Sequence, residues 1–290
     1  MEFVATLIAA PEGRLTRRLA DDMARALGAQ GVNWIEEGVA CDIAANGQRS
    51  AVSEQVEQTL TGRWPLAAVD WIVQPLAHRR KKLLIADMES TIITCECLDE
   101  LAEMAGIRDE IAAITARAMN GELDFETALR RRVGSLKGLP ESALNQVMDE
   151  KVRLMPGARE LVSAMKKSGA YTMLVSGGFD FYASRIAAEL GFDEWRANRL
   201  EIKDGALTGH VIPPILGKEA KLDALYDACK KLGITPEDTL AVGDGANDLP
   251  MLLAAGLGVA YHAKPNVRAQ ARARIDHGDL RALLWAQGYR

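Results

Sequence analysis

Hydrophobic and polar positions follow two different patterns along this chain of 290 residues. In roughly the first 75 residues, short strand-like runs alternate with amphipathic segments in which apolar residues recur every four positions. This pattern predicts elements in the order β-α-β-α-β, over Phe3 to Ile8, Leu15 to Leu27, Val32 to Ala44, Val52 to Leu60 and Ala67 to Val73. We expect a small, ferredoxin-like α+β domain over residues 1–78.

A basic run, His78-Arg79-Arg80-Lys81-Lys82, follows this region. The run contains no aromatic residue on which a base could stack, so it makes a poor nucleic-acid site. We interpret it as a solvated linker between two domains.

From residue 83 onward, short and fully apolar runs are typical of buried parallel strands. They are Leu83 to Ala86, Tyr171 to Val175, Leu240 to Val242 and Gly258 to Ala260. Helical patterns separate these runs, and Leu200 to Val211, with a central Asp204-Gly205 turn, predicts a hairpin. We expect a doubly wound, Rossmann-like parallel sheet over residues 79–290, with a helical cap inserted after its first strand at about 95–154.

Composition excludes several classes of protein. No apolar run reaches the ~18 residues of a membrane-spanning helix. Lys and Arg total 35 against 40 Asp and Glu, and this net charge of -5 argues against a nucleic-acid or anionic-membrane partner. The N-terminus lacks the basic residues of a secretory signal, and the 4 cysteines lack paired CxxC spacing. We therefore expect a cytoplasmic protein with reduced thiols and no zinc.

Polar residues follow three of the apolar runs at the point where each ends. Asp87 to Thr91 follow the first, Ser176-Gly177-Gly178 the second, and Gly243 to Asp248 the third, while Lys221 lies on the helical segment before that third run. In an open α/β sheet, ligands bind beyond the carboxyl ends of the strands. Carboxylates, a hydroxyl, glycines and a lysine at this edge are what Mg²⁺-assisted phosphoryl transfer requires.

Five blocks of the sequence resemble the phosphoserine phosphatase family of the haloacid dehalogenase superfamily. The blocks are Asp87-Met88-Glu89-Ser90-Thr91, Asn120-Gly121-Glu122-Leu123-Asp124-Phe125, Arg130-Arg131-Arg132-Val133 with Lys137-Gly138-Leu139, Val175-Ser176-Gly177-Gly178-Phe179, and Val242-Gly243-Asp244-Gly245-Ala246-Asn247-Asp248-Leu249. The resemblance covers about residues 83–290. It implies Mg²⁺-dependent hydrolysis of O-phospho-L-serine to L-serine and phosphate, the last step of serine biosynthesis. The N-terminal region is similar to ACT-like domains, which implies regulation or homodimerisation.

The same resemblance implies a role for each matching residue. Asp87 would be the nucleophile that forms an aspartyl-phosphate, and Glu89 would be the general acid and base. Asp87, Asp244, Asp248 and the backbone carbonyl of Glu89 would hold Mg²⁺. The substrate-binding residues would be Ser176, Gly177, Lys221 and Asn247 for the phosphoryl group, Glu96 and Arg132 for the ammonium and carboxylate, and Phe125 with Met119 for the apolar side of the pocket. We interpret Lys264 as a packing residue.

Glu89 departs from the family pattern, which usually has Asp at this position. Its extra methylene moves the carboxyl by about a bond length, and a misplacement of ~1 Å can cost on the order of a hundredfold in rate. Either the loop accommodates the longer side chain or the protonation step is altered. Some relatives with the longer acid are phosphoserine:homoserine phosphotransferases, so that activity, or another small-metabolite phosphatase activity, stays an alternative.

Overall fold

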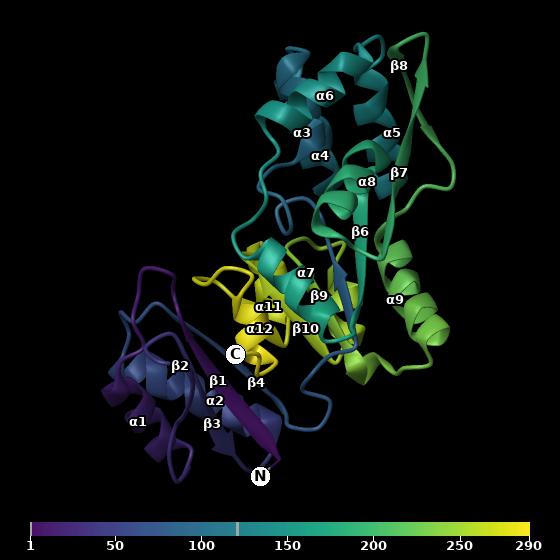
Figure 1. Ribbon diagram of the computed structural model, residues 1–290. Coiled ribbons are helices and arrows are strands. Elements are labelled where there is room, and N and C mark those ends of the chain that lie inside the picture. Colours follow the sequence, from purple (N-terminus) through teal and green to yellow (C-terminus); the bar gives the residue numbers. More distant parts are fainter. Residues whose placement is uncertain (1, 120–121) are drawn as a thin grey trace.

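Figure 1 shows the computed structural model, which describes residues 2–119 and 122–290. The N-terminal part is an antiparallel sheet with the strand order β2-β3-β1-β4. Its elements are β1 (Phe3–Ala9), α1 (Arg17–Ala26), β2 (Asn33–Glu36), β3 (Ala40–Ala45), α2 (Arg49–Arg63) and β4 (Val69–Pro75). Alternate residues of the strands pack against the apolar faces of the two helices, as the sequence pattern predicted.

The single strand predicted from Val32 to Ala44 is wrong, because this segment holds two strands. β2 and β3 form an antiparallel hairpin, and the chain reverses at Gly38, which has a φ of 76°. That left-handed conformation is easily adopted by glycine and disfavoured for other residues. The apolar residues on both sides of the turn merge into one run when only hydrophobicity is considered.

The larger part of the chain is built around a seven-stranded sheet with the order β11-β10-β9-β5-β6-β7-β8. All neighbouring strands are parallel except β7 and β8, which form the predicted antiparallel hairpin. The strands are β5 (Leu83–Ala86), β6 (Tyr171–Phe179), β7 (Glu194–Lys203), β8 (Ala206–Ile212), β9 (Thr239–Gly243), β10 (Leu257–Tyr261) and β11 (Ala273–Ile275). The predicted α/β fold class is confirmed.

Helices cover both faces of this sheet (Figure 1). They are α7 (Ala158–Lys167), α8 (Asp180–Leu190), α9 (Lys218–Leu232), the 3₁₀ turn Pro236–Asp238, α10 (Leu249–Ala254), α11 (Pro265–Gln270) and α12 (Ala282–Ala286). Among the helices of the described residues, none combines the length and apolar character needed to cross a membrane.

The strand register brings the ends of three core strands together. Central β5 pairs with β6 on one side and β9 on the other, so Ala86 lies level with Leu174 and Val242. The first residue beyond β5, Asp87, donates its backbone N–H to the carbonyl of Val242 at 3.0 Å. Polar residues that follow these strands are thereby delivered to one edge of the sheet.

Four helices form an insertion above this edge, at the top of Figure 1. They are α3 (Cys97–Met104), α4 (Arg108–Met119), α5 (Phe125–Ser135) and α6 (Glu141–Glu150). The chain enters and leaves the insertion side by side, because Ile93 and Leu154 form an antiparallel bridge. The far end of the β7–β8 hairpin also joins it, through the bridge between Pro140 and Ala206. Sequence periodicity did not predict this pairing between the hairpin and the cap.

The interpretation of His78 to Lys82 as a solvated linker is wrong for part of the run. The Arg79 guanidinium donates to both carboxylate oxygens of Asp42, at 2.7 and 2.8 Å, and to the backbone carbonyl of Ala286 at 2.8 Å. Lys81 is buried, and its Nζ donates to the carbonyl of Glu237 at 2.7 Å. Arg79 therefore joins the N-terminal sheet to the rest of the chain, and Lys81 is bonded within the larger part of the chain.

A second contact reinforces this junction. Asp70 on β4 is buried and accepts backbone N–H groups from three consecutive residues that follow β11, with distances of 2.6 to 3.2 Å. The donors are Asp276, His277 and Gly278. We call the Asp42–Arg79 pair and the Asp70 contact together the domain junction.

Candidate active site

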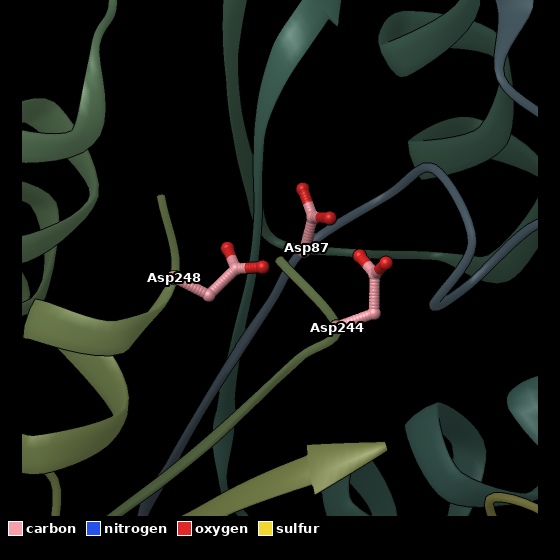
Figure 2. Close-up of side chains that lie close together, drawn as sticks. All are labelled: Asp87, Asp244 and Asp248. Carbon is pink, nitrogen blue, oxygen red and sulfur yellow. The ribbon is translucent and has the colours of Figure 1, made fainter. Parts of the chain in front are cut away.

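Three aspartates converge at the carboxyl edge of the core sheet (Figure 2). Asp87 follows β5, Asp244 follows β9, and Asp248 immediately precedes α10. Each is buried, and one carboxylate oxygen from each lies within 4.8 Å of the others. Such an all-oxygen set of closely spaced carboxylates fits a hard divalent cation.

Two glycines allow the loop from Gly243 to Asp248 to close so tightly. A Cβ atom at Gly243 would lie 2.4 Å from Cγ of Asp248, and one at Gly245 would lie 2.4 Å from Oδ1 of Asn247. The backbone N–H of Gly245 donates to Oδ2 of Asp248 at 2.9 Å. The glycines therefore fold the loop back on its own side chains and hold the Asp248 carboxylate in place.

Lys221 supplies the buried positive charge of the cluster. It lies on α9 with a relative exposure of 2%, and its Nζ donates to Oδ1 of Asp87 and Oδ1 of Asp248 at 2.5 Å each. Burial by itself disfavours the ammonium, but the carboxylates of Asp248 and Asp87 outweigh burial and raise the pKa of Lys221. A fixed cation in this position suits a phosphoryl group.

Negative charge nevertheless exceeds positive charge at this edge, and the carboxyl pKa values show it. Burial, followed by the neighbouring Asp248, raises the pKa of Asp87 well above its ordinary value, although Lys221 opposes this. Burial likewise raises the pKa of Asp244 to about 6, against the opposing charge of Lys264. Both shifts show that the ionised form of the carboxyl is disfavoured here, chiefly by burial, and a bound divalent cation would stabilise that form.

Ser176 and Gly177 lie in the last part of β6, which extends beyond the predicted apolar run, at the same edge of the sheet as Asp87. The Ser176 hydroxyl is buried and accepts the backbone N–H of Gly178 at 2.9 Å. Asn198 on β7 fixes the loop from the other side: its amide donates to the carbonyl of Gly177 at 2.8 Å and accepts the N–H of Leu216 at 2.7 Å. Sequence reasoning missed Asn198, because a single amide on a strand carries no recognisable signal.

Glu89 lies two residues after Asp87, and its carboxylate is held on two sides. Oε1 accepts the backbone N–H of Cys97 at 2.8 Å, at the start of the cap. Oε2 faces Gly178, where a Cβ atom would lie only 2.4 Å away. Burial, followed by the charge of Glu96, raises the pKa of Glu89 to about 7. A carboxyl with this pKa both donates and accepts a proton near neutral pH.

The predicted substrate residues of the cap surround Glu89. Arg132 lies among the negative charges of Asp99, Glu89 and Glu96, and burial lowers the pKa of its guanidinium. Its Nε is buried without a hydrogen-bond partner within the described residues, so this donor is available to a ligand. Glu96 is exposed and accepts the Ser90 hydroxyl at 2.8 Å.

Phe125, at the start of α5, packs over the glycines next to the site. A Cβ atom added at Gly177 or at Gly217 would lie 3.6 Å from its ring, so the ring packs over both glycines. Asn247 lies on the Gly245 loop, and its side chain contacts that loop. The Met119 side chain and residues Asn120 and Gly121, which the sequence analysis also singled out, lie outside the described residues.

Lys264 is misassigned by the sequence analysis, which treated it as a packing residue. It is about half exposed, and its Nζ lies 3.8 Å from Oδ2 of Asp244. Its backbone N–H also donates to the Asp244 carbonyl at 3.2 Å. The loop after β10 therefore contributes a second lysine to the edge of the carboxylate cluster, a placement that depends on the β9–β10 pairing and not on local sequence.

Comparisons with known proteins agree with this geometry. Residues 84–253 match the family model of the haloacid dehalogenase-like hydrolases. A phosphoserine phosphatase from Polaromonas sp. is 49% identical over 208 residues, which cover 70% of this chain and 88% of that protein.

Two solved structures are also similar. A probable phosphoserine phosphatase from Vibrio cholerae has a TM-score of 0.79 at 32% identity, covering 99% of this chain and 86% of that one. A substrate-bound phosphoserine phosphatase complex has a TM-score of 0.66 at 42% identity, covering 71% of this chain and 98% of that one. The family match spans more than half of the chain, and it includes all three aspartates of the cluster. The chain therefore belongs to the haloacid dehalogenase-like hydrolases.

Proposed function

We propose that this chain is a phosphoserine phosphatase, which hydrolyses O-phospho-L-serine to L-serine and phosphate. The observation that carries the proposal is the buried cluster of Asp87, Asp244 and Asp248 at the carboxyl edge of the sheet, in which the Lys221 ammonium contacts Asp87 and Asp248. The high identity to phosphoserine phosphatases over the same region supports the choice of substrate. The reaction is the last step of L-serine biosynthesis.

In the first step, an oxygen of Asp87 attacks phosphorus, and the bond between phosphorus and the seryl oxygen breaks. Lys221 holds positive charge beside the attacking oxygen, 2.5 Å from Asp87 in the structure. The Ser176 hydroxyl and the backbone at Gly177 hold the phosphoryl oxygens. Glu89, with its pKa near 7, donates the proton that the leaving seryl oxygen requires.

In the second step, the roles of Glu89 reverse. As a carboxylate it accepts a proton from water, whose oxygen attacks phosphorus and releases Asp87 and inorganic phosphate. Two carboxylates with different surroundings thus divide the work between them: Asp87 contacts the fixed cation of Lys221, whereas Glu89 contacts a backbone N–H.

The metal of this proposal is Mg²⁺, held by the carboxylates of Asp87, Asp244 and Asp248 with the backbone carbonyl of Glu89. When bound, it neutralises charge on the phosphoryl oxygens and lowers the repulsion between those oxygens and Asp87. Beyond the phosphoryl group, Arg132 offers its unpartnered Nε to the substrate carboxylate. Glu96 pairs with the substrate ammonium, and Phe125 covers the methylene between these groups. A small zwitterion needs such opposite charges at fixed positions.

The domain assignment belongs to the same proposal. We assign residues 1–78 to an ACT-like regulatory or dimerisation domain and residues 79–290 to the phosphatase domain, with a cap over about 95–154. The four-stranded antiparallel sheet supports the first of these, and the pairing of Ile93 with Leu154 supports the cap limits. We expect a homodimer through the N-terminal sheet, which sedimentation would reveal, no nucleic-acid or membrane partner, and a reducing, cytoplasmic location for the 4 free cysteines.

The test is the release of inorganic phosphate from O-phospho-L-serine, measured with Mg²⁺ and again with excess EDTA. We expect rapid release that EDTA abolishes. Homoserine is then added, because the longer acid Glu89 also suits a phosphotransferase. Phosphohomoserine formed faster than phosphate would move the assignment to that alternative, and no turnover of phosphoserine under either condition would contradict the proposal.

A further inference from the structure

The contact between Glu89 and Gly178 is closer than any side chain at position 178 would allow. A Cβ atom there would lie 2.4 Å from Oε2, 2.8 Å from Cδ and 3.1 Å from Oε1 of Glu89. These distances involve the whole carboxyl group and not only one oxygen. The bare Cα of Gly178 therefore forms one wall of the space that the Glu89 carboxyl occupies.

Glu89 is held against this wall by a hydrogen bond. Its Oε1 accepts the backbone N–H of Cys97 at 2.8 Å, and the residue is half-buried. Gly178 is equally fixed, because its N–H donates to the Ser176 hydroxyl at 2.9 Å and it lies within β6. Both partners of the contact are thus anchored by independent hydrogen bonds.

The backbone of Gly178 does not itself require glycine. Its φ lies outside the left-handed region that disfavours side chains, so alanine fits the local conformation. The cost of a side chain at this position therefore comes from the Glu89 carboxyl. The contact between position 178 and the Glu89 carboxyl can therefore be changed by a substitution at either residue.

We propose that Gly178 is a positioning residue that sets the reach of the longer acid Glu89, so that the two residues work as a matched pair. An aspartate at position 89 would withdraw the carboxyl by about 1.5 Å, one carbon–carbon bond, and would free the space beside Gly178. The absence of a side chain at 178 is thus how the loop accommodates the extra methylene. This inference rests on the proposed function of Glu89 as general acid and base.

The test is a double-mutant cycle with Gly178→Ala, Glu89→Asp and the double variant, measured by kcat and KM for phosphoserine and by Tm. Gly178→Ala should lower kcat on the order of a hundredfold with little change in KM, because it displaces the carboxyl by ~1 Å. It should also lower Tm by about 3 °C or more through overpacking. The kcat of the double variant should be at least tenfold higher than that of Gly178→Ala. The added methyl group should also lower Tm less in the Glu89→Asp background than in the wild-type background. The control is Gly62→Ala on α2, where no described atom beyond the adjoining helix backbone and chain neighbours lies within 4 Å of an added Cβ.

The inference would be overturned if the two substitutions acted independently. In that case the fold losses in kcat would multiply in the double variant, and the losses in Tm would add. If Gly178→Ala does not fold, the double variant is compared with Glu89→Asp alone. In that background, adding the methyl group at position 178 should lower kcat less than threefold. A loss of kcat of tenfold or more would contradict the pairing of the two residues. A wild-type chain that releases no phosphate would refute the proposed function and the catalytic part of this inference, whereas the Tm cycle still tests the contact itself.

Discussion

The carboxylate cluster and the domain junction both bury charged side chains, and they balance them differently. Within the domain junction, Arg79 donates twice to the carboxylate of Asp42, and the carboxylate of Asp70 accepts backbone N–H groups. The Thr6 hydroxyl and the carbonyl of Ala286 complete the hydrogen bonds. At the carboxylate cluster, the buried ammonium of Lys221 pairs with Asp87 and Asp248, and Asp244 lies 3.8 Å from the half-exposed Lys264. The junction carboxylates are satisfied by hydrogen bonds from a guanidinium or from backbone N–H groups, whereas the carboxylate cluster gathers three carboxylates around fewer cations.

This difference separates a structural role from a functional one. The Asp42–Arg79 pair balances one charge with the other and holds two parts of the chain together. At the carboxylate cluster, burial, together with the neighbouring charge of Asp248, raises the pKa of Asp87 and of Asp244, and such perturbed groups in one place are typical of catalytic sites. Burial of charge alone therefore does not identify an active site, whereas uncompensated burial of like charges does.

The largest effect on activity is expected at Asp87 of the carboxylate cluster. Asp87→Asn removes the nucleophile and should lower kcat for phosphoserine by on the order of 10⁴-fold or more. The fold should persist, because Lys221 keeps its bond to Asp248. Phosphate release gives the rate, and circular dichroism with a melting curve checks the fold. Turnover within tenfold of wild type would show that Asp87 is not the nucleophile.

The corresponding change at the junction is Asp42→Asn, which should have the opposite profile. Removing one partner of this partly buried ion pair leaves Arg79 uncompensated, so the free energy of unfolding should fall by about 2 kcal/mol. The substitution is far from the carboxylate cluster in the fold, and kcat should stay within about twofold of wild type. Urea denaturation and phosphate release measure the two quantities on the same sample. A large loss of kcat with unchanged stability would contradict the division of roles.

A smaller difference between the two regions is expected in the pH dependence of stability. Asp244 has a pKa of about 6 in the folded chain and an ordinary value of 3.8, so the folded state binds the proton more tightly. Stability of the metal-free protein should therefore rise as pH falls, by about 1 kcal/mol between pH 7 and pH 5. Asp244→Asn should remove this contribution, whereas Asp42→Asn should retain it. Melting curves in EDTA at the two pH values measure it, and equal pH dependence in wild type and Asp244→Asn would refute it.

The sequence predicts the carboxylate cluster well because its information is local. Asp87, Ser176 and Asp244 each directly follow a short apolar run, or follow it by one residue, and parallel strands deliver their carboxyl ends to one edge. The order of the runs along the chain and the fold class then suffice to bring these groups together. No tertiary detail is needed to place them.

The domain junction could not be predicted in the same way. Arg79 meets Asp42 and Ala286, residues 37 and 207 positions away, and nothing in the local sequence marks such partners. A run of basic residues is usually solvated, and that general expectation failed for Arg79 and Lys81. Lys264 was missed for a similar reason, because its proximity to Asp244 arises from the pairing of β9 with β10.

The space that receives the Glu89 side chain is formed by one contact that is local in sequence and one that is distant. Its departure from the family pattern is visible in the sequence, but the two groups that receive its carboxyl are not. Cys97 lies eight residues away at the start of the cap, and Gly178 lies on the neighbouring strand. Only the assembled fold shows that the longer side chain has a matching space.

The most direct measurement is calorimetric titration of Mg²⁺ into the metal-free wild-type chain, Asp244→Asn and Asp42→Asn. If excess negative charge at the carboxylate cluster defines the active site, wild type and Asp42→Asn should bind one Mg²⁺ per chain with the same affinity. Asp244→Asn should bind at least tenfold more weakly, because it removes one charged ligand. Equal binding by all three proteins, or weakened binding only in Asp42→Asn, would contradict the account.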